Sequence, residues 1–146
     1  MKEEFLDKII FYFENAPSGR RGKLDEPFIN KIREFLNKLG PKKIWEKKGI
    51  LNKDQNTNIF PDFVMILNNK IIACEAEKKA VTAKFDLYKN IKIFDELWFF
   101  TEIPLEKKHL HYKFENDIKK PQKFFGLNEV GKIVEIKPTK SAVSVT

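Results

Sequence analysis

Two apolar runs separated by a pair of asparagines constrain the fold of this chain more than any other feature. Residues 59–67 (IFPDFVMIL) and 70–78 (KIIACEAEK) flank Asn68-Asn69. Asparagine is one of the few residues that adopt the left-handed backbone of a two-residue hairpin turn. The sequence therefore predicts an antiparallel β-hairpin, and a two-residue turn fixes which residues face each other along it.

Two amphipathic helices are predicted before the hairpin. Residues 3–14 repeat apolar side chains about every four positions, which indicates a helix that docks on the core as an N-terminal extension over 1–18. A second helix is expected between a capping residue at Asp25 and the Gly40-Pro41 stop. Its apolar residues form one stripe, so this helix should pack on a flat apolar surface.

The pattern is weaker between the second helix and the hairpin. Residues 43–46 form a short candidate strand. Residues 49–58 (GILNKDQNTN) are polar, rich in asparagine and without periodicity. This composition predicts a surface loop.

Helix and strand patterns alternate after the hairpin. A helix is predicted over 80–94, and residues 97–100 are an apolar run typical of a strand covered on both faces. A strand, helix and strand in one sheet almost always form a right-handed parallel crossover, so the sheet should be mixed. A charged helix over 105–119, a last hairpin turning at 128–131 and a flexible tail at 141–146 complete the prediction. All 146 residues are thus expected to form a single α/β domain, with a central mixed β-sheet flanked by helices.

Composition narrows the classes of function. A net charge of +7 favours a phosphate-rich partner, although a lysine-rich surface also serves solubility. The single cysteine, Cys74, forms neither an internal disulfide nor a cysteine-based zinc site, and strand alternation turns it away from the face of Glu75. No run of 18 apolar residues and no clean apolar N-terminal run is present, so a cytoplasmic protein with no membrane partner is expected.

Three carboxylates are predicted to gather at one end of the hairpin. The register places Asp62 directly across from Glu75, and strand alternation puts Glu77 and Lys79 on the same face as Glu75. Facing acids repel each other unless something positive lies between them. We expect Mg²⁺ or Mn²⁺ there, because hard divalent cations bind carboxylates and accept phosphate oxygens.

The same residues resemble a family motif. Pro61-Asp62, followed by Glu75-Ala76-Glu77-Lys78-Lys79 at the end of an apolar strand, resembles the signature of the PD-(D/E)xK nuclease superfamily. The order of elements over 24–101 also resembles the catalytic core of that family, a restriction-endonuclease-like α-β-β-β-α-β arrangement. The resemblance implies that Asp62 and Glu75 are metal ligands, with the carbonyl of Ala76 as a third.

One position departs from the family pattern, which usually has a lysine two residues after the second acid. Here that position is Glu77. Either an acid replaces the lysine, as in some restriction enzymes of the superfamily, or the motif is shifted to Glu77-Lys78-Lys79. We prefer Asp62, Glu75 and Glu77 as catalytic residues, because only Glu75 is predicted to face Asp62. Lys79 then lends positive charge on the same face.

A weaker resemblance lies upstream. Archaeal-type Holliday-junction resolvases of the superfamily have a basic residue and a glycine, then a glutamate four residues on at the start of the first helix. Arg21-Gly22 and Glu26 stand at that spacing, which implies that Glu26 is a further metal ligand. The other interpretation of Glu26 is an ordinary first-turn acid, favoured by the helix dipole.

These observations predict a Mg²⁺-dependent DNA endonuclease, with junction or flap substrates slightly favoured. Four basic residues flank the proposed site in sequence and are the candidates for contact with phosphates: Arg20, Arg21, Lys47 and Lys48. The other interpretation of each is an ordinary solvated surface charge. Because the core nearly fills the chain, specificity is expected from a homodimer or from DNA shape. The alternatives are a type II restriction endonuclease and a non-catalytic DNA-binding or assembly protein on the same fold.

Overall fold

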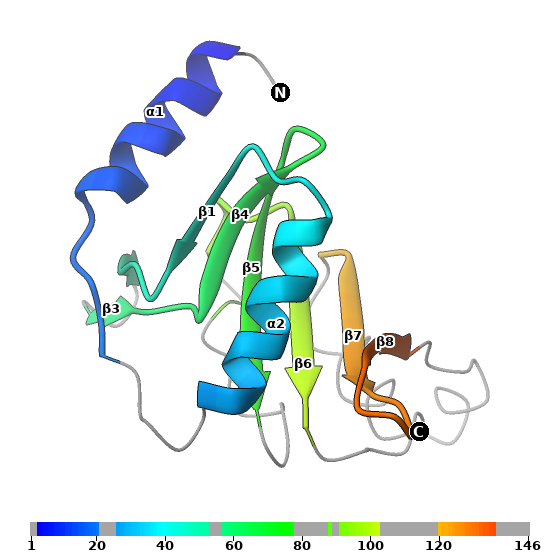
Figure 1. The fold of residues 1–146 in the computed structure, drawn as a ribbon. Coiled ribbons are helices and arrows are strands. Elements are labelled where there is room, and N and C mark those ends of the chain that lie inside the picture. The colour runs from blue at the N-terminus through cyan, green and yellow to red at the C-terminus, as the bar shows by residue number, and fades with distance from the viewer. Residues whose placement is uncertain are drawn as a thin grey trace, which may run out of the picture.

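The computed structural model describes residues 3–20, 26–52, 57–77, 88, 91–102 and 120–136. Within this part of the chain it has two helices and eight strands: α1 (Glu3–Asn15), α2 (Glu26–Lys38), β1 (Lys43–Glu46), β2 (Ile50–Asn52), β3 (Thr57–Ile59), β4 (Phe63–Leu67), β5 (Lys70–Glu77), β6 (Glu96–Thr101), β7 (Gln122–Leu127) and β8 (Ile133–Ile136). Six strands form one sheet in the order β1-β4-β5-β6-β7-β8, while β2 and β3 pair separately. The chain therefore has the predicted α/β fold with a central sheet (Figure 1).

The hairpin of β4 and β5 has the predicted register. Asn68 and Asn69 both have positive φ angles, of 52° and 61°, as a two-residue turn of this kind requires. Leu67 faces Lys70 next to the turn, and Phe63 faces Cys74 at the far end. The asparagine pair therefore determines the alignment of the two strands over their whole length.

The remaining strands make the sheet mixed. β1 pairs with β4 and β7 pairs with β8 in the antiparallel sense, whereas β6 lies parallel to both β5 and β7. All six residues of β6 are buried, and the apolar run over 97–100 is thus covered on both faces as predicted. The predicted turn at 128–131 joins β7 to β8, where the Asn128 side chain accepts hydrogen bonds from the N–H groups of Val130 and Lys132.

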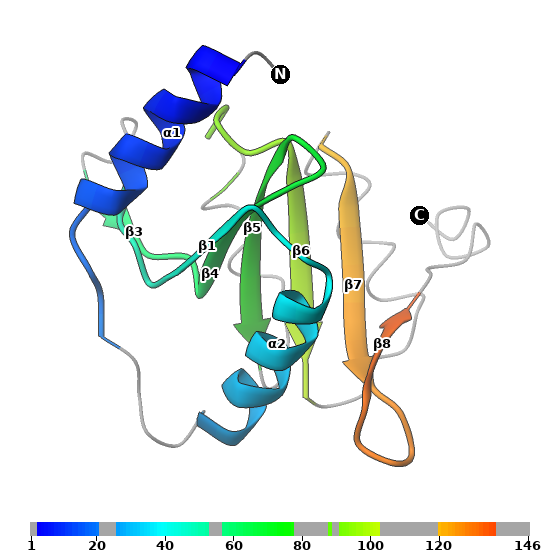
Figure 2. The same cartoon turned by 45° about the horizontal axis from the view of Figure 1, so that its top comes forward.

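Each face of the sheet is covered by one of the two helices. The stripe of α2 packs on the face that carries Phe63 and Cys74, and Figure 1 shows α2 lying across β5. Buried residues of α1 pack on the other face, with Trp45 and Val64. Figure 2 shows α1 beside β1 and away from α2, so the two helices lie on opposite sides of the sheet.

The prediction of a surface loop over 49–58 is wrong. β2 and β3 lie in this segment and pair with each other, with Ile50 facing Ile59. Both isoleucines are buried. Strands of three residues are too short to show a periodicity in the sequence. Ile59 belongs to β3 and not to the β4–β5 hairpin.

The predicted helix over 80–94 is also too long at its C-terminal end. Tyr88 is helical, but residues 91–95 are not. Backbone bonds to β5 hold this segment: the N–H of Asp95 donates to the carbonyl of Ile71, and the Asp95 carboxylate accepts from the N–H of Ile71. The chain must leave the helix early to enter β6 at this point. The predicted cap at Asp25, the helix over 105–119 and the tail at 141–146 lie outside the described residues.

Candidate active site

A row of three charged residues crosses the strands at one end of the sheet. The β1–β4 register ends with Glu46 opposite Phe63, and just beyond it the Lys47 N–H donates to the Asp62 carbonyl while Lys47 Nζ lies 3.9 Å from Asp62 Oδ1. The β4–β5 register ends with Phe63 opposite Cys74, and the next two residues, Asp62 and Glu75, are in contact through the hydrogen bond from the Asp62 N–H to Glu75 Oε1. Side chains that face each other across adjacent strands lie on one face of a sheet. The row therefore reads lysine, aspartate, glutamate on a single face.

Hydrogen bonds lock the two acids together. The N–H of Asp62 donates to Glu75 Oε1 at 3.0 Å, and the N–H of Ala76 donates to Asp62 Oδ2 at 2.8 Å. Asp62 is 7% exposed and Glu75 is 4% exposed. Two carboxylates are thus held in contact with the backbone of the other strand in a nearly buried position, which costs free energy unless a cation or donors compensate.

The backbone of Ala76 lies beside the two acids. The N–H and C=O of one strand residue point toward the same neighbouring strand. Because the N–H of Ala76 reaches Asp62, its carbonyl oxygen also points to the β4 side. The Pro61 carbonyl accepts a hydrogen bond from Lys47 on the β1 side, and proline has no N–H that could donate to the Ala76 oxygen. An oxygen ligand beside the two carboxylates is therefore compatible with the hairpin.

Lys47 brings a positive charge to the acids from the end of β1. Its Nζ lies 3.9 Å from Asp62 Oδ1 and donates a hydrogen bond to the Phe60 carbonyl at 3.2 Å. Its backbone N–H is shared between the carbonyls of Pro61 and Asp62. Lys47 also has a φ of 53°, which is a strained conformation for a residue other than glycine. Tertiary contacts therefore impose the position of this lysine.

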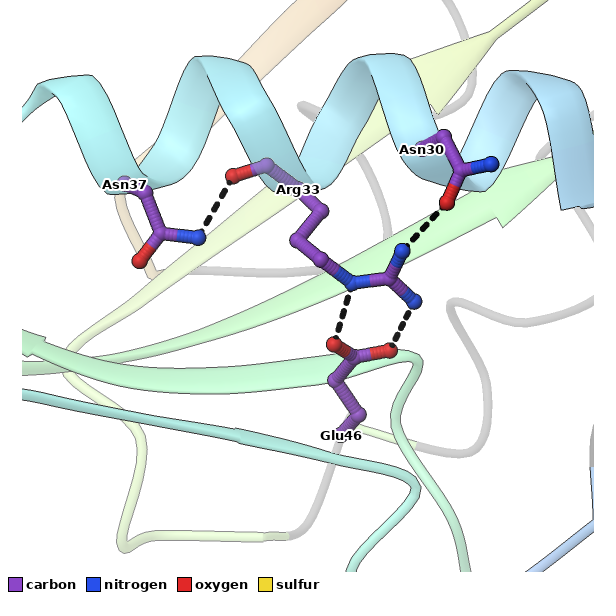
Figure 3. A network of polar contacts seen from close by, with 4 residues as sticks. All are labelled: Asn30, Arg33, Asn37 and Glu46. Carbon is purple, nitrogen blue, oxygen red and sulfur yellow. Dashed lines mark hydrogen bonds and ion pairs between the residues drawn. The ribbon is translucent and has the colours of Figure 1, made fainter.

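A bidentate ion pair fixes the residue before Lys47. The guanidinium of Arg33 on α2 donates to both carboxylate oxygens of Glu46, at 2.6 and 2.7 Å, and to the side chain of Asn30 (Figure 3). The hydrogen bond to Glu46 raises the pKa of Arg33 above its ordinary value. Asn37 donates in turn to the Arg33 carbonyl. α2 thereby holds the end of β1 next to the acid pair.

Tyr88 is a residue of the site that the sequence pattern identified only as part of a helix. It is 1% exposed and packs edge-on against Phe94. Burial, together with the charges of Glu75 and Asp62, raises its pKa well above the ordinary value, and its hydroxyl hydrogen-bonds to the Glu75 side chain. Tyr88 therefore stays protonated at neutral pH and donates a hydrogen bond to Glu75. A buried tyrosine hydroxyl usually has a hydrogen-bond partner. A tyrosine on the apolar stripe of the predicted helix was therefore the feature of the sequence that could have indicated a contact with the acids.

Cys74 lies on the other face, as alternation predicts, and is buried against α2. Burial and the nearby negative charges raise the pKa of its thiol well above the ordinary value. The thiol is therefore protonated at neutral pH and packs as a small apolar side chain.

The other predicted catalytic and metal residues are placed only in part. Glu77 ends β5 opposite Thr101, but its side chain lies outside the described residues, as do Lys79 and Arg21. Glu26 is exposed at the first residue of α2, the helix that covers the face opposite Asp62 and Glu75. Among the described residues, no group of three or more His, Cys, Asp and Glu side chains could hold a metal ion. The roles of these residues stay predictions.

Two further basic residues predicted to bind phosphate are described. Arg20 is exposed. Lys48 is half-buried and donates from Nζ to the Ala16 carbonyl at 3.2 Å, on the connection from α1. Neither described helix is long and apolar enough to cross a membrane.

A comparison with known proteins finds a structural similarity to one solved structure. No family model and no curated protein matches this sequence. The chain is similar to the small subunit of the heterodimeric restriction endonuclease R.BspD6I, with 14% identity and a TM-score of 0.44 over 82% of this chain and 72% of that one. At this level of similarity, the functional interpretation has to come from the side chains described above.

Proposed function

We propose that this protein is a Mg²⁺-dependent endonuclease that hydrolyses phosphodiester bonds in DNA. The observation that carries the proposal is the nearly buried pair of Asp62 and Glu75, which face each other at the end of the β4–β5 hairpin. Hard oxygen atoms in such a cluster fit Mg²⁺, which binds through one or two carboxylates, keeps several waters and accepts phosphate oxygens. When bound, the ion supplies an activated water and polarises the phosphate.

Each residue of the site has a distinct task in this proposal. Asp62 and Glu75 hold the ion, with the carbonyl of Ala76 as a third oxygen ligand. Tyr88 fixes the orientation of Glu75 by donating to it, as residues behind metal ligands commonly do. Glu77 is assigned to a second ion or to the attacking water, because it is the next residue of β5 on the same face.

The charge of the protein supports DNA as the substrate. A net charge of +7 attracts a polyanion, and the acid pair would repel a phosphate without an ion between them. Exposed Arg20 is a candidate for contact with the DNA backbone. Homodimer formation, by which two such sites would cut two strands, is part of the proposal.

A second candidate function is a non-catalytic DNA-binding protein on the same fold. One specific observation favours it: Asp62 and Glu75 each accept a hydrogen bond from a backbone N–H of the facing strand. Donors of this kind stabilise buried carboxylates without a metal. A binding protein would keep the basic surface and show no metal-dependent cleavage.

A cleavage assay separates the two candidates. Labelled linear duplex, flap and four-way DNA are incubated with the protein in Mg²⁺ and, as a control, in EDTA. We expect cleavage of at least one substrate in Mg²⁺ and none in EDTA. DNA binding without cleavage of any of the three would contradict the proposed enzyme and support the binding protein.

A further inference from the structure

We propose that Lys47 is a catalytic residue of this site, whose ammonium group contacts the scissile phosphate and stabilises the charge that develops during cleavage. The inference deepens the proposed function and rests on it. It starts from the row of charges across three strands, in which Lys47 stands beside Asp62 at the end of β1. β5 has glutamates at positions 75 and 77, so it has no lysine at the position where the family pattern usually has one.

The backbone of Lys47 is held from three directions. Its N–H bonds to the carbonyls of Pro61 and Asp62 on the connection to β4. Its own carbonyl accepts a hydrogen bond at 2.7 Å from the N–H of Gly19, on the connection after α1. The preceding residue, Glu46, is clamped by Arg33 of α2. A side chain that starts from so constrained a backbone is well suited to a fixed catalytic position.

The conformation of Lys47 points the same way. Its φ of 53° lies in the left-handed region, which residues other than glycine, asparagine and aspartate seldom adopt. Strained residues persist where the surrounding structure determines them, and they concentrate at functional sites. Glycine would relieve the strain, but it would remove the amine.

The amine is placed where a phosphate bound beside the acids would meet it. Nζ lies 3.9 Å from Asp62 Oδ1, and the side chain is 21% exposed, so it is partly desolvated and still reachable. A fixed cation in such a position stabilises transition-state charge more than a solvated one. Lys43, at the other end of β1 opposite Ile66, instead pairs with Glu14 at 3.1 Å and makes a matched control.

The chemistry requires no proton from Lys47. The oxygen of a water molecule forms a bond to phosphorus as the bond from phosphorus to the leaving sugar oxygen breaks. One proton of that water passes to solvent, and the leaving oxygen takes up a proton from solvent. The ammonium group keeps its charge throughout and donates hydrogen bonds to a phosphate oxygen.

The test uses Lys47→Met, Lys47→Arg and Lys43→Met in the full chain. Cleavage is measured with Mg²⁺ on the linear, flap and four-way DNA panel, and Mg²⁺ affinity is measured by titration calorimetry without DNA. We expect Lys47→Met to lose about 100-fold or more in cleavage rate, by analogy with the removal of one transition-state donor. Its Mg²⁺ affinity should be unchanged or tighter, because a positive charge beside Asp62 is gone. Lys47→Arg should restore part of the rate, and Lys43→Met should cleave like the wild type.

The contrary outcomes are distinct. Wild-type rates in Lys47→Met would overturn the role of Lys47 and leave the proposed nuclease standing. If Lys47→Met lost both Mg²⁺ binding and cleavage, Lys47 would only support the structure of the acid pair. A wild-type protein that neither binds Mg²⁺ nor cleaves the panel would overturn the proposed function and this inference with it.

Discussion

Replacement of Asp62 by asparagine should separate the stability of the hairpin from its ability to bind a metal. Asparagine keeps an oxygen that accepts the N–H of Ala76, but it has no negative charge. The variant loses an attraction to Lys47 at 3.9 Å, about 4 kcal/mol at an effective dielectric constant of about 20. It also loses the repulsion from Glu75 on the facing strand, a term of opposite sign. We therefore expect the free energy of unfolding without metal to change by no more than about 1 kcal/mol.

Urea unfolding with and without Mg²⁺ tests this expectation. An ion that binds the folded state alone should stabilise the wild type by about 2.7 kcal/mol at a concentration 100 times its dissociation constant. Asp62→Asn should show almost no such gain and should not cleave DNA. Equal stabilisation of both proteins by Mg²⁺, or undiminished cleavage by the variant, would remove Asp62 from the metal site. A loss of several kcal/mol without metal would show that Asp62 serves mainly the fold.

Four further results are expected. Tyr88→Phe should lower Mg²⁺ affinity about 10- to 100-fold by calorimetry, because Glu75 loses its phenolic donor. If Glu75 is the metal ligand, Glu75→Gln should be inactive, whereas Glu77→Lys and Lys79→Ala should each keep part of the cleavage activity. An active Glu75→Gln together with an inactive Lys79→Ala would instead indicate the motif Glu77-Lys78-Lys79. Burial acts to raise the pKa of Glu96, but hydrogen bonds from Trp98 and Lys70 outweigh it, so the pKa in the folded protein lies below its ordinary value of 4.5. The ionised carboxylate therefore stabilises the fold above that pH, and this contribution is lost as the pH falls through the folded pKa. In urea unfolding from about pH 7 to pH 3, the free energy of unfolding of Glu96→Gln should fall less than that of the wild type. DNA affinity should fall with salt by about 0.9 logarithmic units per neutralised phosphate, and a flat dependence would indicate another partner.

The acid pair could be predicted from the sequence because its geometry is local. Asn68-Asn69 closes the hairpin with two residues, so the facing positions of Asp62 and Glu75 follow from counting along the strands. The mixed sheet follows from the strand, helix and strand order after the hairpin. Short-range geometry of this kind leaves little freedom.

The position of Lys47 could not be predicted in the same way. Residues 47–62 connect β1 to β4 and include the β2–β3 hairpin, so no tight turn fixes the β1–β4 register. The Arg33–Glu46 ion pair that holds the end of β1 depends on how α2 packs across the sheet. Packing of this kind leaves no periodic signal in the sequence.

Titration calorimetry with Mg²⁺ on the wild type, Glu75→Gln and Glu96→Gln tests the central claim most directly. Glu96 is a matched control, since it is also a buried acid but lies away from the acid pair, on β6 opposite Ile72. Its carboxylate accepts a hydrogen bond from Nε1 of Trp98 on the other face of the sheet. We expect the wild type and Glu96→Gln to bind Mg²⁺ alike and Glu75→Gln to lose about 100-fold or more in affinity. No binding by the wild type, or equal binding by Glu75→Gln, would contradict a metal site at Asp62 and Glu75.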